Sequence, residues 1–78
     1  MNTDKLVHMA NQIGAFFEGD PDREAALDGV AGHLRRFWDP RMRRELLSCI
    51  DAGGAESLAP LVREAIARRR QLIDPPPS

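Results

Sequence analysis

Residues 9–30, MANQIGAFFEGDPDREAALDGV, contain a helical pattern, a stop signal and a second helical pattern. On both sides of the stop, apolar residues recur three and four positions apart, a spacing that places them on one side of an α-helix. Between the two patterns, Gly19 is a helix terminator, Asp20 is a favoured N-cap residue and Pro21 suits the first helical position. The stretch therefore predicts two helices joined by a short turn.

The same pattern continues in both directions and predicts four helices in all, because Asp39-Pro40 repeats the start signal. The expected helices run from Thr3 to Glu18 (capped by Thr3 or Asn2), from Pro21 to Trp38, from Pro40 to Gly53-Gly54 and from Ser57 to about Leu72. The residues expected to face the core are Leu6, Met9, Ala10, Ile13, Phe16 and Phe17 in the first helix, Ala26, Leu27, Val30, Leu34, Phe37 and Trp38 in the second, Met42, Leu46, Cys49 and Ile50 in the third, and Leu58, Leu61, Val62, Ala65 and Ile66 in the fourth.

The linkers between these helices are short, which favours neighbours that pack side by side. The expected fold class is therefore all-α: a small compact bundle of four helices in one domain, residues 1–73, followed by an extended Pro-rich tail, residues 74–78. Gly29 and Gly32 each weaken the second helix by about 1 kcal/mol relative to alanine. We expect them to allow the close approach of another helix, although Gly32 points away from the apolar stripe.

The small size of the chain limits its stability. A domain of 78 residues buries only about 60% of the surface that its unfolded chain exposes, and such domains usually depend on disulfides, a metal or a partner. Cys49 is the single cysteine, and His8 and His33 are the only other soft metal ligands. A partner protein is the remaining source of stability.

No arrangement of residues typical of catalysis or cofactor binding is found. Gly53-Gly54 has no preceding strand and no following lysine, so it is not a phosphate-binding loop, and no pair of cysteines is available for a metal or a cluster. A free-standing enzyme with Cys49 as nucleophile is one hypothesis, but the helical phase places Cys49 beside Leu46 as a small buried hydrophobe. We expect no catalytic, cofactor-binding or metal-binding residue in this chain.

Charge is unevenly distributed along the chain, although the net charge is only −1. Residues 1–34 contain 2 basic and 6 acidic residues, whereas residues 35–78 contain 9 arginines and 6 acidic residues. Arg43 and Arg69 fall within apolar arcs of their helices, so each is expected either to extend to the rim or to meet an acidic group. Three interpretations of these arginines remain open: a solvated face, a protein-docking surface and a nucleic-acid-binding module. Nucleic acid is the least favoured, because the N-terminal half of the chain is acidic.

The turn between the second and third helices is the predicted docking surface. It combines a large aromatic ring, a thioether and three guanidinium groups, and interface hot spots are enriched in Trp and Arg. We expect Arg41 and Arg44 to face outward and Arg43 to lie at the rim. The full candidate site is His33, Trp38, Pro40, Arg41, Met42, Arg43 and Arg44; the alternative is that Trp38 and Met42 are core and the arginines are solvated.

The N-terminus has no pattern of a signal peptide, and no stretch approaches the roughly 20 apolar residues of a membrane span. With a single unpaired cysteine, these features favour a reducing compartment. We expect a cytoplasmic protein that does not contact a membrane.

Two segments together resemble a known family. MANQIGAFF (residues 9–17) and HLRRFWDPRMRRELL (residues 33–47), followed by GG…LAPLVREAI within residues 53–66, resemble the delta subunit of soluble NAD-dependent formate dehydrogenase. FWDPRMR is the most specific of these elements. The resemblance covers residues 5–66, and the segment after Arg70 adds nothing to it.

The resemblance implies an accessory role in an enzyme that oxidises formate to carbon dioxide and reduces NAD. In this family, molybdenum or tungsten bis-molybdopterin guanine dinucleotide, iron–sulfur clusters, FMN and the NAD site are carried by the larger subunits. The delta subunit is linked to assembly, cofactor insertion or stability of the complex. The resemblance thus implies a non-catalytic chain that packs against a larger subunit, with the alpha subunit as the expected partner.

Overall fold

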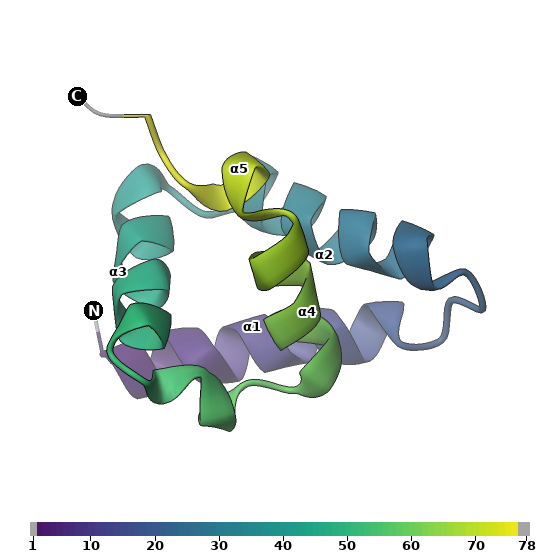
Figure 1. Cartoon of the computed structure of the whole chain (residues 1–78), viewed down its shortest axis with the longest axis horizontal. Helices are drawn as coiled ribbons and strands as arrows, with labels where there is room; N and C mark the ends of the chain where they lie inside the picture. Colours follow the sequence, from purple (N-terminus) through teal and green to yellow (C-terminus); the bar gives the residue numbers. More distant parts are fainter. Residues whose placement is uncertain (1, 77–78) are drawn as a thin grey trace.

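The structure, a computed structural model, describes residues 2–76 and confirms the all-α fold class. Its elements are α1 (Thr3–Phe17), α2 (Arg23–Phe37), α3 (Pro40–Asp51), the short 3₁₀ turn η1 (Gly54–Ser57), α4 (Pro60–Arg68) and α5 (Arg70–Ile73). Figure 1 shows α1 and α2 along the long axis of the molecule, α3 across one end, and α4 in front of them. The chain therefore folds as four main helices with two short additional turns.

Polar side chains cap three of the helices. Asn2 accepts a hydrogen bond from the backbone N–H of Asp4 at 2.8 Å, and Asp39 accepts one from Met42 at 2.9 Å ahead of Pro40. Both caps agree with the sequence prediction. Satisfying these otherwise unpaired N–H groups fixes where each helix begins.

The predicted start of the second helix is wrong by two residues. Asp22 is the N-cap, accepting from the N–H of Ala25 at 3.3 Å, and α2 begins at Arg23. Asp20 instead accepts from the N–H of Asp22 at 2.9 Å and closes a turn around Pro21. An Asp-Pro-Asp sequence offers two capping carboxylates, and the first of them stabilises the turn between the helices.

The predicted fourth helix exists, but its predicted bounds are wrong, because residues 57–72 do not form one helix. Pro60 keeps the preceding residue, Ala59, in an extended conformation (φ −60°, ψ 148°), so α4 begins at Pro60. The backbone leaves the helical conformation again at Arg69 (φ −122°, ψ 28°), and α5 follows. This break turns the chain so that Ile73 is fully buried.

The core lies around α2, which packs against α1, α4 and α5. Its buried apolar side chains are Leu6, Val7, Ala10, Ala26, Leu27, Val30, Ala31, Leu34, Trp38, Leu46, Leu47, Leu58, Leu61, Val62, Ala65, Ile66 and Ile73. Gly29 lies directly under the ring of Phe17, so the expected close approach is confirmed there. It is wrong for Gly32, where a Cβ would meet no atom within 4 Å.

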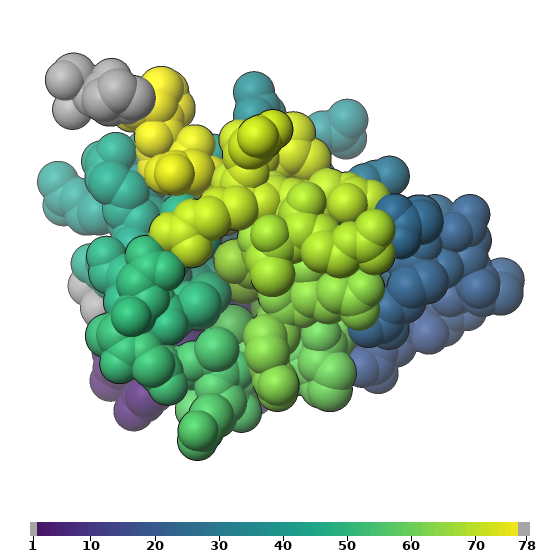
Figure 2. Space-filling model, in the orientation of Figure 1, coloured from purple at the N-terminus to yellow at the C-terminus, as the bar shows by residue number. Residues whose placement is uncertain are grey.

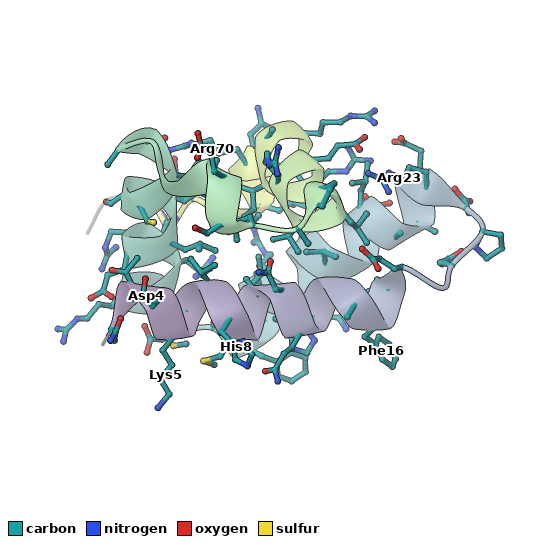
Figure 3. All side chains as sticks on the ribbon, turned by 90° about the horizontal axis from the view of Figure 1, so that it is seen from below. Asp4, Lys5, His8, Phe16, Arg23 and Arg70 are labelled. Atoms are coloured by element: carbon teal, nitrogen blue, oxygen red, sulfur yellow. The ribbon has the colours of Figure 1, made fainter. Side chains whose placement is uncertain are left out.

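Two aromatic residues expected in the core are on the surface. The side chains of Phe16 and Phe37 are 80% and 70% exposed. Each is the neighbour of another aromatic residue, and adjacent side chains on a helix point about 100° apart. Phe17 and Trp38 take the inward positions, and Figure 3 shows Phe16 on the side of α1 that is turned away from α4.

At the C-terminus, Asp74 is extended and Pro75 is buried. Residues 77–78 of the expected tail lie outside the described residues. The division into a domain at 1–73 and a tail at 74–78 stays a prediction.

Candidate partner-docking site

Four arginines are bound by acidic side chains of the same chain. Their pairs are Arg23 with Glu64, Arg68 with Glu24 and Glu64, Arg69 with Glu24 and Asp28, and Arg70 with Asp51. Two of these six pairs join α2 to α4, and two more join α2 to Arg69, which lies between α4 and α5. Figure 2 shows the start of α2 lying against α4 on this face. Figure 3 shows Arg23 at the start of α2 and Arg70 at the α3 side of the molecule. The three consecutive arginines at residues 68–70 are thus all paired with acidic side chains within the fold.

These pairs lower the pKa values of Glu24, Glu64 and Asp51. A hydrogen bond from Arg69 holds the pKa of Glu24 below its ordinary value of 4.5, and one from Arg23 does the same to Glu64. Arg70 likewise lowers the pKa of Asp51. The favoured state of all three carboxyls is the charged, paired one.

Three further arginines donate to backbone carbonyl groups. Arg35 reaches the carbonyl of Leu72 at 3.4 Å, Arg43 that of Ile73 at 3.2 Å, and Arg63 that of Leu58 at 3.0 Å. The first two carbonyls are at the end of α5, where helical partners are lacking and cationic side chains are favourable. Arg35 and Arg43 therefore fasten the C-terminal turn to α2 and α3.

The expectation that Arg43 lies at the rim is wrong. Its side chain is buried, at 9% exposure, and its Nε has no hydrogen-bond partner among the described residues. Its place in the apolar arc of α3 directs it inward, and the end of α5 supplies a carbonyl there. The sequence pattern could not show this, because the return of α5 depends on the break at Arg69.

Among the arginines, only Arg36, Arg41 and Arg44 make no side-chain hydrogen bond or ion pair within residues 2–76. All three are exposed, and the outward direction predicted for Arg41 and Arg44 is confirmed. Arg41 and Arg44 line an open hollow of about 650 Å³ on α3, together with Thr3, Glu45, Ser48, Cys49, Ala52 and Gly54. We call it the cationic hollow, since two guanidinium groups there face one half-buried carboxylate, that of Glu45.

The predicted docking residues do not form one continuous surface. Trp38 is 5% exposed and belongs to the core, and Met42 is half-buried against it. His33 lines hollows between α1 and α2, with its ring centroid 4.7 Å from that of Phe37. Pro40 is exposed beside Arg41. Whether any of these residues contacts a partner stays a prediction.

Sequence reasoning missed the exposure of Phe16 and Phe37 and the free state of Arg36. A signal for the first was available, since two adjacent aromatic residues on one helix cannot both face the same core. No comparable signal in the sequence separates Arg36 from Arg35. The partner of Arg35 lies in α5, which is distant in sequence, and Arg36 has no partner among the described residues.

Cys49 lies on the edge of the cationic hollow. It is half-buried and packs against the core, so its expected full burial is only partly realised. Among residues 2–76, no group of three or more His, Cys, Asp or Glu side chains is placed to hold a metal ion. Within the same range, no helix has the length and apolar character needed to cross a membrane.

A comparison with known families finds a match. The family model of the NADH-dependent formate dehydrogenase delta subunit, FdsD, matches residues 5–66. The chain belongs to this family. No curated protein and no solved structure matches the chain.

The part that matches the delta-subunit family spans most of α1, all of α2, α3 and η1, and α4 as far as Ile66. It includes Arg36, Arg41 and Arg44 and both exposed phenylalanines, while α5 lies beyond it. This chain is therefore a delta subunit of NAD-dependent formate dehydrogenase, and its free arginines lie within the family's own segment.

Proposed function

We propose that this delta subunit is non-catalytic and acts in the cytoplasm by docking on a larger formate dehydrogenase subunit through the cationic hollow. On the family resemblance, the alpha subunit is the proposed partner. Docking supports assembly, cofactor insertion or stability of the complex, whose other subunits carry the molybdopterin, iron–sulfur, FMN and NAD sites. The observation that carries this proposal is that Arg41 and Arg44 have no side-chain partner within residues 2–76, whereas most of the other arginines there are paired.

The chemistry of the cationic hollow suits an acidic partner surface. A guanidinium group binds a carboxylate through two parallel hydrogen bonds and loses its water more readily than an ammonium group. In the free chain both arginine side chains are exposed to solvent, so their charges lower the stability of the fold very little. On docking, acidic side chains of the larger subunit would neutralise them in a partly desolvated interface.

A nucleic-acid-binding function has less support. Phosphate binding needs several free cations on one surface, because each neutralised phosphate adds to the affinity. Arg68, Arg69 and Arg70 are bound by acidic side chains of the same chain. Only three arginines remain without a partner in the described residues, which is a small footprint for such a function.

Charge reversal tests this proposal. In Arg41→Glu, Arg44→Glu and the double variant, the substitutions lie in the first turns of α3, where acidic side chains are compatible with the helix dipole. The variants should fold normally, and the double variant should no longer co-purify with the larger subunits. Lys5→Glu is the matched control for each single reversal, because Lys5 is an exposed cation on the side of α1 that Figure 3 shows turned away from α4. Undiminished co-purification of the double variant would rule out the cationic hollow as the docking site.

A further inference from the structure

A second surface lies between α1 and α2. Two adjoining hollows of about 370 and 300 Å³ share Phe17 and His33 in their walls. The residues that form this surface are Ile13, Phe16, Phe17, Gly32, His33, Arg36 and Phe37, and we call it the aromatic groove. None of these residues except His33 was part of the docking site expected from the sequence.

The walls of the aromatic groove are apolar and open to solvent. Phe16 and Phe37 are the two most exposed large apolar side chains of the described chain, at 80% and 70%. Phe16 packs edge-on against Phe17 with ring centroids 5.0 Å apart, and Phe37 lies against His33 at 4.7 Å. Exposed aromatic side chains grouped in this way are typical of protein interaction sites.

The floor of the aromatic groove includes a glycine. Gly32 lines the larger hollow, and a Cβ placed there would meet no atom within 4 Å. A glycine in a helix interior costs about 1 kcal/mol relative to alanine. In contrast to Gly29, which makes room for Phe17, Gly32 makes room for no group of the described chain.

The charges at the aromatic groove favour an acidic occupant. Asp28 also lines the larger hollow, but Arg69 binds its carboxylate at 2.7 Å. Arg36, on the same hollow, has no partner within residues 2–76. A second copy of the chain, bound by the same patch about a two-fold axis, would bring another Arg36 and another Asp28 into the interface, and Arg69 already binds the carboxylate of that Asp28. Charge complementarity therefore points to a different protein that presents a carboxylate.

We propose that the aromatic groove binds an amphipathic helix of a larger formate dehydrogenase subunit. Apolar side chains on one face of that helix would lie over Gly32 and between Phe16 and Phe37, and an acidic side chain at its edge would bind Arg36. Helix-in-groove recognition of this kind uses apolar anchors spaced three and four residues apart. The inference rests on the proposed function, in that it takes the chain to dock on larger subunits, and it adds a second contact surface.

Filling the groove tests this inference without disturbing the core. Gly32→Leu places a side chain in open space and replaces a glycine inside a helix, so the isolated chain should melt no lower than the parent. Its recovery with tagged larger subunits should nevertheless fall at least about tenfold, the equivalent of one RT ln 10 in binding. Ala67→Leu is the control, since it adds an exposed leucine on α4, and Ala67 lines neither the aromatic groove nor the cationic hollow.

A second probe covers the case in which Gly32→Leu does not fold. The double variant Phe16→Gln, Phe37→Gln removes two exposed rings and leaves the core intact, and it should lose the larger subunits to a similar extent. Normal recovery of this variant, or of folded Gly32→Leu, would overturn the inference. A dimer of the isolated parent chain that Gly32→Leu dissociates would also overturn it, by assigning the groove to self-association.

The same assay separates the two proposals. If the groove variants are recovered normally while the Arg41→Glu, Arg44→Glu variant is not, the groove inference fails and the proposed function stands. If the parent chain itself is not recovered with the larger subunits, the proposed function fails, and the groove inference fails with it.

Discussion

At the residue scale, glycines of two helices have opposite surroundings. Gly14 in α1 is buried, and a Cβ added there would lie 2.4 Å from a methyl group of Val62, itself fully buried in α4. Gly32 in α2 faces open space. The absence of a side chain is therefore needed for helix packing at Gly14 and leaves surface uncovered at Gly32.

The same substitution should have opposite effects at these two positions. Gly32→Ala should raise the free energy of unfolding by about 0.5–1 kcal/mol, the usual difference in a helix interior. Gly14→Ala should lower it by roughly 1 kcal/mol, because overpacking against a stiff, buried valine costs about 1–3 kcal/mol and outweighs that gain. Urea unfolding of the two variants beside the parent measures both values. Stabilisation by Gly14→Ala would show that α1 and α4 are not packed as described.

The residue scale also shows the limit of a helical-wheel argument. The wheel correctly placed Leu34 and Leu46 in the core, and both are fully buried. It could not choose between adjacent aromatic residues, because both Phe16 and Phe17 fall near the apolar arc. The choice depends on the position of α2, because the missing side chain of Gly29 leaves room for the ring of Phe17.

At the element scale, the starts of α1 and α3 were predictable from local capping, whereas the C-terminal region was not. Proline signals the start of α4 through its effect on Ala59, and this signal was present in the sequence. The break at Arg69 has no local breaker residue. It depends on contacts that are distant in sequence, such as those of Arg69 with Asp28 and of Arg43 with Ile73.

The short helix α5 should contribute strongly to stability, although it lies outside the family-matched residues 5–66. Ile73 is fully buried, so Ile73→Ala should lower the free energy of unfolding by about 2–5 kcal/mol. Its neighbour Leu72 is 37% exposed, and Leu72→Ala should cost clearly less. Chemical unfolding of the two variants gives this comparison, and equal costs would contradict the fastening of α5 to the core.

The ion pairs of Glu24 and Glu64 predict how stability depends on pH. The pKa values of Glu24 and Glu64 are lowered from 4.5 by Arg69 and Arg23, so each carboxyl binds a proton more weakly in the folded chain than in the unfolded one. Their stabilising contribution is present above about pH 4.5 and is lost as the pH falls through the lowered folded values.

Acid titration of the unfolding midpoint measures this effect. As the pH is lowered below about 4.5, the unfolding midpoint of the parent chain should decrease. The decrease should be shallower in Arg69→Gln, because this substitution removes the largest cause of the lowered pKa of Glu24. High salt should reduce the difference between the two proteins, because these side chains are exposed. The same pH profile in both proteins would show that the pairs do not stabilise the fold.

At the scale of the whole molecule, fold class and family could be predicted from the sequence, and the proposed docking surface only in part. Helical spacing and turn signals determine an all-α chain, and a few segments such as FWDPRMR carry the family resemblance. Which arginines remain free depends on the pairing of all the others. Arg41 and Arg44 were expected outside, while Arg43 in the same run is buried.

The isolated chain should be helical and only marginally stable. It has 78 residues and a single cysteine, so one small core must offset the whole entropic cost of folding. Circular dichroism during heating should show a helical spectrum and a midpoint no higher than the usual mesophilic range of about 45–65 °C. A strand-rich spectrum, or a sharp transition far above this range, would contradict the expectation.

The measurement that bears most directly on the role of the chain compares formate dehydrogenase assembled with it and without it. Cofactor content per large subunit and NADH formation per cofactor-loaded enzyme are determined on both preparations. If the chain is a non-catalytic docking subunit, its absence should lower the fraction of complete, cofactor-loaded enzyme and leave the turnover of each loaded enzyme unchanged. Full cofactor loading with reduced turnover per enzyme, restored when the chain is added back, would contradict this account and make the chain a participant in catalysis.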